Sequence, residues 1–275
     1  MASKRPDKNR QPITTREDLD AALAILTEHA RVRDDLVRAD VRLELQCQAI
    51  ERRLGLRAPK VETLDGVTLP KELRRPRPIP SPIALAEGQD VLEILRDKAQ
   101  AAIQSSRHLK EREMVALAQR LPIWPWVASV RGFGDLSFAL IVAMTTTVIA
   151  TPEGMTVKDL CCYDNPAKVW KRLGLAVIDG ERQRKVKDRE LALRHGYSPQ
   201  KRAALYVIGD TLMKGNQDGL YHTVYVNRKA LEQERHPELS LMVAHKRAMR
   251  YMTKLLVKHV WQHWRDATPL PTDAT

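Results

Sequence analysis

A turn with two glycines is the first part of the sequence whose residue types could do chemistry. Gly132 and Gly134 flank Phe133, and Arg131 precedes them, within the segment Val130–Ala139. Glycine permits a positive φ, so consecutive backbone N–H groups can converge with no Cβ between them. Such amides, with the amino end of the following helix, form a cradle for one phosphate. The pattern predicts a helix–hairpin–helix in which Arg131, Gly132 and Gly134 contact a nucleic-acid backbone. The alternative is a turn that merely joins two helices.

A basic segment follows the apolar sequence Leu173-Gly174-Leu175. Cationic side chains that neutralise phosphates release counterions, which supplies most of the non-specific affinity for nucleic acid. The side chains predicted to make such contacts here are Arg182, Arg184, Lys185 and Lys187. The alternative is a solvated, charged turn.

A predicted helix start supplies two further cations. Ser198 is expected to cap this helix, with Pro199 at its first position, a combination typical of helix amino ends. Lys201 and Arg202 then fall in the first exposed turn, and both are predicted to contact nucleic acid.

The composition favours a polyanionic partner. The 275 residues include 46 Lys and Arg against 34 Asp and Glu, a formal net charge of +12. A surplus of this size is typical of nucleic-acid-binding proteins, although a solubilising surface charge is the alternative. Three cysteines give no disulfide framework, and the longest apolar run is shorter than the roughly 20 residues of a membrane span. We therefore expect a soluble protein of the cytoplasm without a membrane partner.

Long helices are predicted ahead of these segments. Residues 1–14 form a basic arm that is expected to be disordered. Apolar residues at helical spacing between Thr15 and Gly55 predict one helix of about 40 residues. A proline-rich linker at 56–88 leads to a second helix, from about Gln89 to Arg120. Residues 15–120 are thus predicted to form a helical hairpin or coiled coil and, through it, a homodimer. A helix docked along its own domain is the alternative.

The rest of the chain is predicted to form a compact α-helical domain over residues 121–265, with a tail at 266–275. Helices are expected at about 137–148, 199–214 and 239–265, and the last carries an apolar stripe from Met242 to Trp264. The predicted fold class is therefore mainly α: a long helical stalk plus a compact domain that contains the helix–hairpin–helix.

The order of the motifs resembles that of a known family. The succession is a glycine hairpin, a segment ending Leu-Gly-Leu, a basic loop, a Gly-polar-Ser turn, the pair Tyr221 and Tyr225, and a terminal helix ending at Trp261 and Trp264. It is similar to the C-terminal domain of the DEDD insertion-sequence transposases, which include Piv-type invertases, and to the coiled coil that precedes it. The resemblance implies DNA as the partner, with a structured RNA as the alternative, and an accessory role in the recombination of a mobile element. It also implies a bacterial protein associated with the nucleoid.

Two departures from that family weigh against catalysis. The family carries a RuvC-like domain with four metal-binding acids, and residues 1–120 contain no strand-rich sequence of that kind. Asp179-Gly180 stands where the family has its nucleophilic serine, and a carboxylate cannot form the phosphoester link that strand exchange requires. We therefore expect a DNA-binding protein that is not an enzyme, with no catalytic residue, metal ion or cofactor.

Other assignments stay open. The chain is alternatively a divergent recombinase that works with a separate nuclease-like recombinase subunit, or a structural protein whose coiled coil is the functional part. Weaker alternatives are Ser198 as a nucleophile and a metal site at His259 and His263. Four aspartates that could gather around Mg²⁺ are Asp135, Asp159, Asp164 and Asp179. The DNA-binding hypothesis predicts an affinity that depends steeply on salt and falls when Arg182, Arg184 and Lys185 are neutralised.

Overall fold

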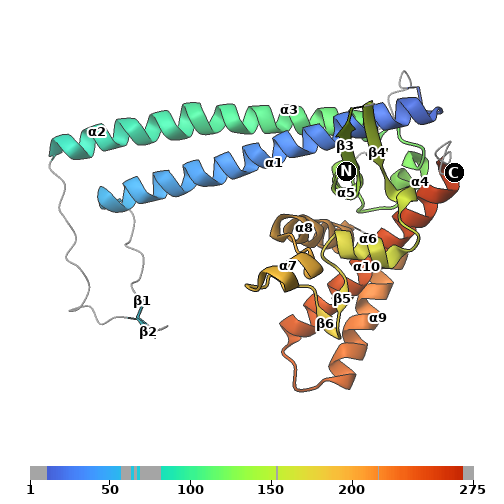
Figure 1. Cartoon of the computed structure of the whole chain (residues 1–275). Coiled ribbons are helices and arrows are strands. Elements are labelled where there is room, and N and C mark those ends of the chain that lie inside the picture. Colours follow the sequence, from blue (N-terminus) through green and yellow to red (C-terminus); the bar gives the residue numbers. More distant parts are fainter. Residues whose placement is uncertain are drawn as a thin grey trace. The chain divides into compact units, whose positions relative to one another are not determined.

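The structure is a computed structural model that describes residues 11–56, 63–64, 67–68, 82–152, 154–215 and 217–268. It is mainly helical and contains long helices, which confirms the predicted fold class (Figure 1). Most of the predicted arm, linker and tail lies outside the described residues. The helices in chain order are α1 (Arg16–Arg53), α2 (Pro82–Glu93), η2 (Ile94–Gln100), α3 (Ala101–Ala118), α4 (Trp124–Ser129), α5 (Asp135–Thr145), η3 (Leu160–Cys162), α6 (Pro166–Arg172), α7 (Arg189–His195), α8 (Pro199–Gly215), α9 (Leu220–Arg235) and α10 (Leu241–Ala267).

The strands of the described residues form antiparallel two-stranded hairpins. They are β1 (Thr63–Leu64) with β2 (Val67–Thr68), β3 (Thr147–Thr151) with β4 (Gly154–Lys158), and β5 (Val177–Ile178) with β6 (Glu181–Arg182). In the hairpin of β5 and β6, Val177 pairs with Arg182 and Ile178 with Glu181.

The first long helix begins and ends at the predicted signals. The Thr15 hydroxyl accepts from the amide of Asp18 at 3.1 Å and so caps α1, and it donates to the Asp18 carboxylate at 2.7 Å. After Arg53 the chain turns through Gly55, whose φ of +77° few other residues adopt. α1 is continuous between these signals, which confirms the single helix of about 40 residues predicted between Thr15 and Gly55.

The chain divides into two compact units. One comprises Met1–Ala30 with Arg112–Thr275 and is here called the compact unit; the other, Arg31–Glu111, is called the helix-pair unit. This division differs from a boundary at residue 121, because Leu19, Leu23 and Leu26 of α1 are fully buried in the core of the compact unit.

The helix-pair unit consists of the later part of α1 and an uninterrupted helical segment from α2 through η2 into α3. Arg33 bonds Glu111 at 2.9 Å, whereas Arg96 bonds Glu51 at 2.6 Å, so the two segments run antiparallel, as predicted. The second segment begins at Pro82 rather than near Gln89, which shortens the predicted linker. Proline lacks an N–H that the first turn of a helix would leave unpaired, so it is compatible with that position.

The core of the compact unit gathers side chains from both ends of the sequence. Its largest fully buried side chain, Trp264 of α10, donates from Nε1 to Asp159 at 3.3 Å. Asp159 is itself fully buried and accepts from Arg16 of α1 at 2.9 Å. This paired charge satisfies groups that would be costly to bury alone. Fully burying a Leu or Phe side chain contributes about 1.5–3 kcal/mol, so the apolar core supplies most of the driving force.

α10 is the central helix of the compact unit, with α8 and α9 packed on it (Figure 1). It covers 241–267 against a predicted 239–265, and α8 covers 199–215 against a predicted 199–214. The apolar stripe of α10 is buried from Met249 to Trp264, but Met242 is more than half exposed, because it lies in the first turn and beyond the core. α5, at 135–145, begins two residues before its predicted start.

Gly209 sets the separation of α8 and α10. A Cβ built on Gly209 would lie 2.7 Å from Oγ1 of Thr253 and 3.1 Å from Cε of Met249. The two helices therefore approach closely at this crossing, which requires glycine on the α8 side.

Candidate nucleic-acid interface

The glycine turn joins α4 to α5, as the helix–hairpin–helix prediction requires, but Gly132 faces protein. Its φ is +85°, and the amide of Phe133 donates to the carbonyl of Val130 at 3.1 Å, so Gly132 holds the third position of a turn that favours glycine. A Cβ here would lie 3.0 Å from the carbonyl oxygen of Leu212, and a Cβ on Gly215 would lie 2.6 Å from Cα of Gly132. Gly132 thus lets the turn pack on the end of α8.

Gly134 is the open position of the turn. It precedes the first residue of α5, is exposed, and would meet no described atom within 4 Å of an added Cβ. The first residue of α5 is Asp135, whose carboxylate accepts from Gln119 at 2.6 Å. A carboxylate at a helix amino end already interacts with its positive dipole and repels a second anion. The predicted phosphate cradle is therefore confined to the surroundings of Gly134 and is electrostatically weakened.

The predicted basic loop contains a short hairpin. Asp179 and Gly180 have φ values of +51° and +78°, as in the type I′ turn that Asp-Gly favours between two antiparallel strands. The hairpin places Arg182 in β6. Arg184 is exposed and bonds Glu181 at 3.0 Å, whereas Lys185 and Lys187 are simply exposed. A helix, α7, then begins at Arg189, between the basic segment and the helix predicted at 199–214, where the sequence predicted no helix.

The start of α8 confirms the predicted cap, but its two cations differ. The amide of Lys201 donates to Oγ of Ser198 at 3.4 Å, and Pro199 is the first helical residue. Lys201 turns inward, and its Nζ donates to the carbonyl of Met144 at 2.8 Å. Burial, and secondarily the charge of Arg172, lower the pKa of Lys201 to about 8. Lys201 therefore binds the carboxyl end of α5, and Arg202 remains for an outside partner.

Arg182 and Arg202 meet in a hollow of about 680 Å³, here called the basic groove. Its lining combines cations from three elements with apolar side chains. The residues that line it are Arg182, Arg202, Leu205, Tyr206, Val243, Lys246, Arg247, Met249, Arg250 and Thr253. None of these lining residues is acidic, so the groove presents one sign of charge to a ligand.

Sequence reasoning missed the contribution of α10 to this groove. Lys246 and Arg247 lie one turn before Arg250, and positions three and four apart share a helix face. This spacing is a signal that the sequence does carry. It became meaningful only when the fold brought that face beside Arg202 of α8.

The charges of the groove are incompletely neutralised. Arg250 donates to the carbonyls of Leu175 and Ala176 at 2.8 and 2.7 Å. Burial, with repulsion from Arg202 and Arg182, lowers its pKa to about 10. Burial likewise lowers the pKa of Arg202, and the nearby Arg182 adds to that shift. Burial and the neighbouring cations disfavour the charged forms of Arg202 and Arg250. A bound anion would offset this cost.

Among the described residues, Arg247 is the groove cation that pairs with a carboxylate. Its Nη1 bonds the buried Glu232 of α9 at 2.9 Å, and Arg228 bonds the same carboxylate. Burial opposes the charge of Glu232, but the two arginine hydrogen bonds more than compensate and lower its pKa. This pair fixes the direction of Arg247 at the edge of the groove.

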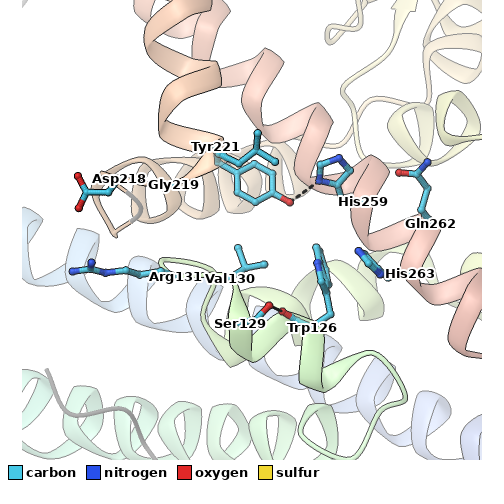
Figure 2. A pocket seen from close by; sticks show the side chains of 11 residues that line it. Trp126, Ser129, Val130, Arg131, Asp218, Gly219, Tyr221, His259, Gln262 and His263 are labelled. Atoms are coloured by element: carbon cyan, nitrogen blue, oxygen red, sulfur yellow. Dashed lines mark hydrogen bonds between the residues drawn. The ribbon is translucent and has the colours of Figure 1, made fainter.

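A second hollow, of about 690 Å³, lies between α4, α9 and α10 and is here called the aromatic pocket (Figure 2). The rings of Trp126 and His263 are stacked with centroids 4.3 Å apart. The Tyr221 hydroxyl and Nδ1 of His259 share a hydrogen bond of 2.8 Å. The remaining lining residues are Ser129, Val130, Arg131, Asp218, Gly219, Leu220 and Gln262. Arg131 of the predicted phosphate site therefore belongs to this pocket and not to the basic groove.

The histidines and aspartates considered as metal ligands each contact a different partner within the protein. His259 contacts Tyr221 and His263 stacks on Trp126. The four aspartates do not share a partner: Asp135 bonds Gln119, Asp159 bonds Arg16, Asp164 bonds Lys168 and Asp179 bonds Arg194. Within the described ranges, no group of three or more His, Cys, Asp or Glu side chains has a geometry that could hold a metal ion.

The structure thus brings together part of the predicted site. Arg182 and Arg202 share the basic groove, whereas Gly132 packs near Gly215 at the opposite end of α8. The helix rises 1.5 Å per residue, so about 20 Å separates Arg202 from Gly215 along its axis. The turn and the groove are therefore two places on the compact unit and not one phosphate site.

Comparisons with known protein families, with curated protein sequences and with solved structures find no match. Within the described helices, no stretch combines the length and the apolar character that a bilayer-spanning segment requires.

Proposed function

We propose that this chain binds nucleic acid through the sugar–phosphate backbone and that the basic groove makes the principal contacts. The observation that carries the proposal is the convergence of five cations on one hollow whose described lining includes no acid. Arg182, Arg202 and Arg250 come from three different elements, so the fold holds like charges together at an electrostatic cost. Anionic ligands offset such a cost, and phosphates arranged along a strand do so repeatedly.

DNA is the proposed partner, and an accessory role in mobile-element recombination is the proposed setting. The support for both is the order of motifs over residues 121–265, which resembles that of the DEDD insertion-sequence transposases. A structured RNA would bind the same cations. Recognition of phosphates positions a strand without reading its bases, so the proposed binding is independent of sequence.

The test compares two triple variants with the same loss of charge. Arg182→Gln/Arg202→Gln/Lys246→Gln removes three groove cations that pair with no carboxylate of the described residues. Arg184→Gln/Lys185→Gln/Lys187→Gln removes three exposed cations that do not line the groove. At about 0.5–1 kcal/mol per surface charge, the groove variant should bind DNA about 10- to 100-fold more weakly. The slope of log affinity against log salt should fall by about 0.9 for each lost phosphate contact.

The second triple variant is the control, and it should lose far less affinity. Equal losses in the two variants would assign binding to diffuse charge and remove the groove from the proposal. Affinity that does not respond to salt in the unmodified chain would remove nucleic-acid binding itself.

Self-association through residues 15–120 belongs to the same proposal. In the helix-pair unit, exposed apolar side chains remain on both segments, among them Val41 and Leu45 of α1 and Ile94 of η2. Burial of such side chains against a second copy would stabilise a dimer. Sedimentation equilibrium should give a dimer for the unmodified chain and a monomer for Val41→Glu/Leu45→Glu. A monomeric unmodified chain would remove this part.

A further inference from the structure

The basic groove has two chemical characters, and phosphate binding uses only one of them. Cations line it together with apolar and weakly polar groups, of which Leu205, Met249 and Thr253 are at most 3% exposed and so offer a ligand almost no surface. Val243 and Tyr206 add apolar surface that remains exposed. A ligand that fills the hollow must therefore present an apolar face together with negative charge.

Paired DNA does not meet this requirement. A duplex keeps its bases stacked inside and offers phosphates, sugars and base edges in two grooves. A hollow of about 680 Å³ is in the size range of pockets that enclose a small molecule, and an intact duplex would only touch its rim. An unpaired nucleotide combines a flat base, which matches the exposed apolar side chains of the groove, with an attached phosphate, which matches its cations.

Tyr206 provides a ring for such a base. It lies one helical turn after Arg202 on α8, so the ring and the guanidinium occupy the same helix face. The side chain is 47% exposed and lines the groove. Proteins that bind single strands without sequence preference combine an exposed aromatic ring with a cationic track in this way, because every base has a π-face.

We propose that the basic groove holds unpaired nucleotides, with a base against the exposed side chains of Tyr206 and Val243 and the adjoining phosphates against its arginines. The inference rests on the proposed function, since it assumes that the groove binds a nucleic-acid backbone. It adds a substrate class: a single-stranded end, flap or bulge attached to a duplex is preferred over the duplex alone. A partner protein with an acidic or phosphorylated segment is the competing occupant that the experiment must separate.

The experiment measures fluorescence anisotropy of the full chain with four labelled probes at constant salt. The probes are a blunt duplex of about 20 base pairs, the same duplex with a thymidine overhang of about six nucleotides, the same duplex with an abasic overhang of equal length, and poly-glutamate. The thymidine and abasic overhangs carry equal charge, so their difference reports contacts with the bases alone. We expect the thymidine overhang to bind about tenfold more tightly than the blunt duplex, and the abasic overhang to lose most of that gain.

Variants at Tyr206 locate the effect. Tyr206→Leu should remove most of the preference for the thymidine overhang, and Tyr206→Phe, which keeps the ring, should retain it. Tyr251→Leu is the matched control, since Tyr251 is 50% exposed on α10 but does not line the groove. Both positions are exposed enough for the three variants to fold, which circular dichroism would verify.

The outcomes separate this inference from the function on which it depends. Equal affinity for the blunt, thymidine and abasic probes would overturn the inference and leave nucleic-acid binding intact. Poly-glutamate that binds as tightly as the thymidine overhang would overturn it in favour of an acidic protein segment. Failure to bind any of the DNA probes would remove the proposed function as well.

Discussion

The basic groove and the aromatic pocket are hollows of similar volume against the same helix, α10, yet their polar groups are in opposite states. In the aromatic pocket, Tyr221 bonds His259 and His263 stacks on Trp126, so these groups already have partners within the chain. In the basic groove, Arg182, Arg202 and Arg250 repel one another. A hollow whose polar groups satisfy each other gains little from a polar ligand, whereas a hollow of like charges gains much.

The difference teaches where function is to be sought in this chain. The aromatic pocket contains the residue types often associated with catalysis, and its hydrogen bonds nevertheless close within the protein. The groove contains no obvious motif, and its significance comes from charges left without acids among the described lining residues. Unsatisfied electrostatics are therefore a better guide here than residue type.

The largest expected effect comes from overpacking the crossing of α8 and α10 beside the groove. Gly209→Val should destabilise the chain by about 1–3 kcal/mol, because an added Cβ at Gly209 lies within 2.7 Å of Thr253 and overpacking forces the helices apart. DNA affinity should fall as well, because Thr253 and Met249, which the new side chain would displace, line the groove. Chemical denaturation and anisotropy provide the two measurements.

Ala203→Val is the matched control for this crossing. Ala203 lies on the exposed side of the same helix, so valine there should cost only its lower helix propensity, about 0.5 kcal/mol. If Gly209→Val and Ala203→Val unfold at the same denaturant concentration, the close approach of α8 and α10 is wrong.

A smaller effect is expected from the aromatic pocket. Tyr221→Phe removes a hydrogen bond of 2.8 Å to His259 and should cost about 0.5–1.5 kcal/mol of unfolding free energy. Tyr225→Phe is an equivalent change outside the pocket, since the Tyr225 hydroxyl and Nδ1 of His245 also share a bond of 2.8 Å. Both variants should keep full DNA affinity. A loss of affinity in Tyr221→Phe alone would transfer the binding site to the pocket and break the comparison.

The smallest effect is a difference in pH response. Burial lowers the pKa of His259 below its ordinary value of 6.5, so the unfolded chain takes up this proton first on acidification. The contribution of His259 to stability is present above pH 6.5 and is lost as the pH falls through its folded-state pKa. Denaturation from pH 7.5 to about 5 should show a larger loss in the unmodified chain than in His259→Gln, in which His245, whose pKa burial also lowers, still contributes.

DNA affinity should not follow the same pH curve. Arg250 has a pKa of about 10, so the groove keeps its guanidinium charges between about pH 6 and 8. An affinity that rises as the pH falls through 6.5 would show that the pocket histidines contact the ligand.

Local signals predicted much of the fold. Thr15 with Asp18, Gly55, and Ser198 with Pro199 act within a few residues of sequence, and the structure confirms each as a helix boundary. The hairpin at Asp179-Gly180 carried an equally local signal, but the surrounding cations suggested a loop. The apolar stripe predicted for α10 begins at Met242, but this side chain is exposed. Periodicity shows which face of a helix is apolar and not how far the core extends along it.

The site was predicted only in part, because it depends on which helices lie side by side. Arg182 and Arg202 were recognisable from local charge, but their meeting with Arg250 depends on the packing of α8 against α10. Lys201 shows the reverse case: it follows the same helix cap as Arg202, yet the neighbouring end of α5 draws it inward. Sequence spacing cannot distinguish these two adjacent cations, since the difference lies in what each meets across space.

The contact between Gly132 and Gly215 has an evolutionary consequence. With Cα of Gly132 only 2.6 Å from where a Cβ of residue 215 would be, neither position tolerates a side chain while the other segment stays in place. In natural variants of this protein we therefore expect glycine to be kept at both 132 and 215, even though 82 residues of sequence lie between them.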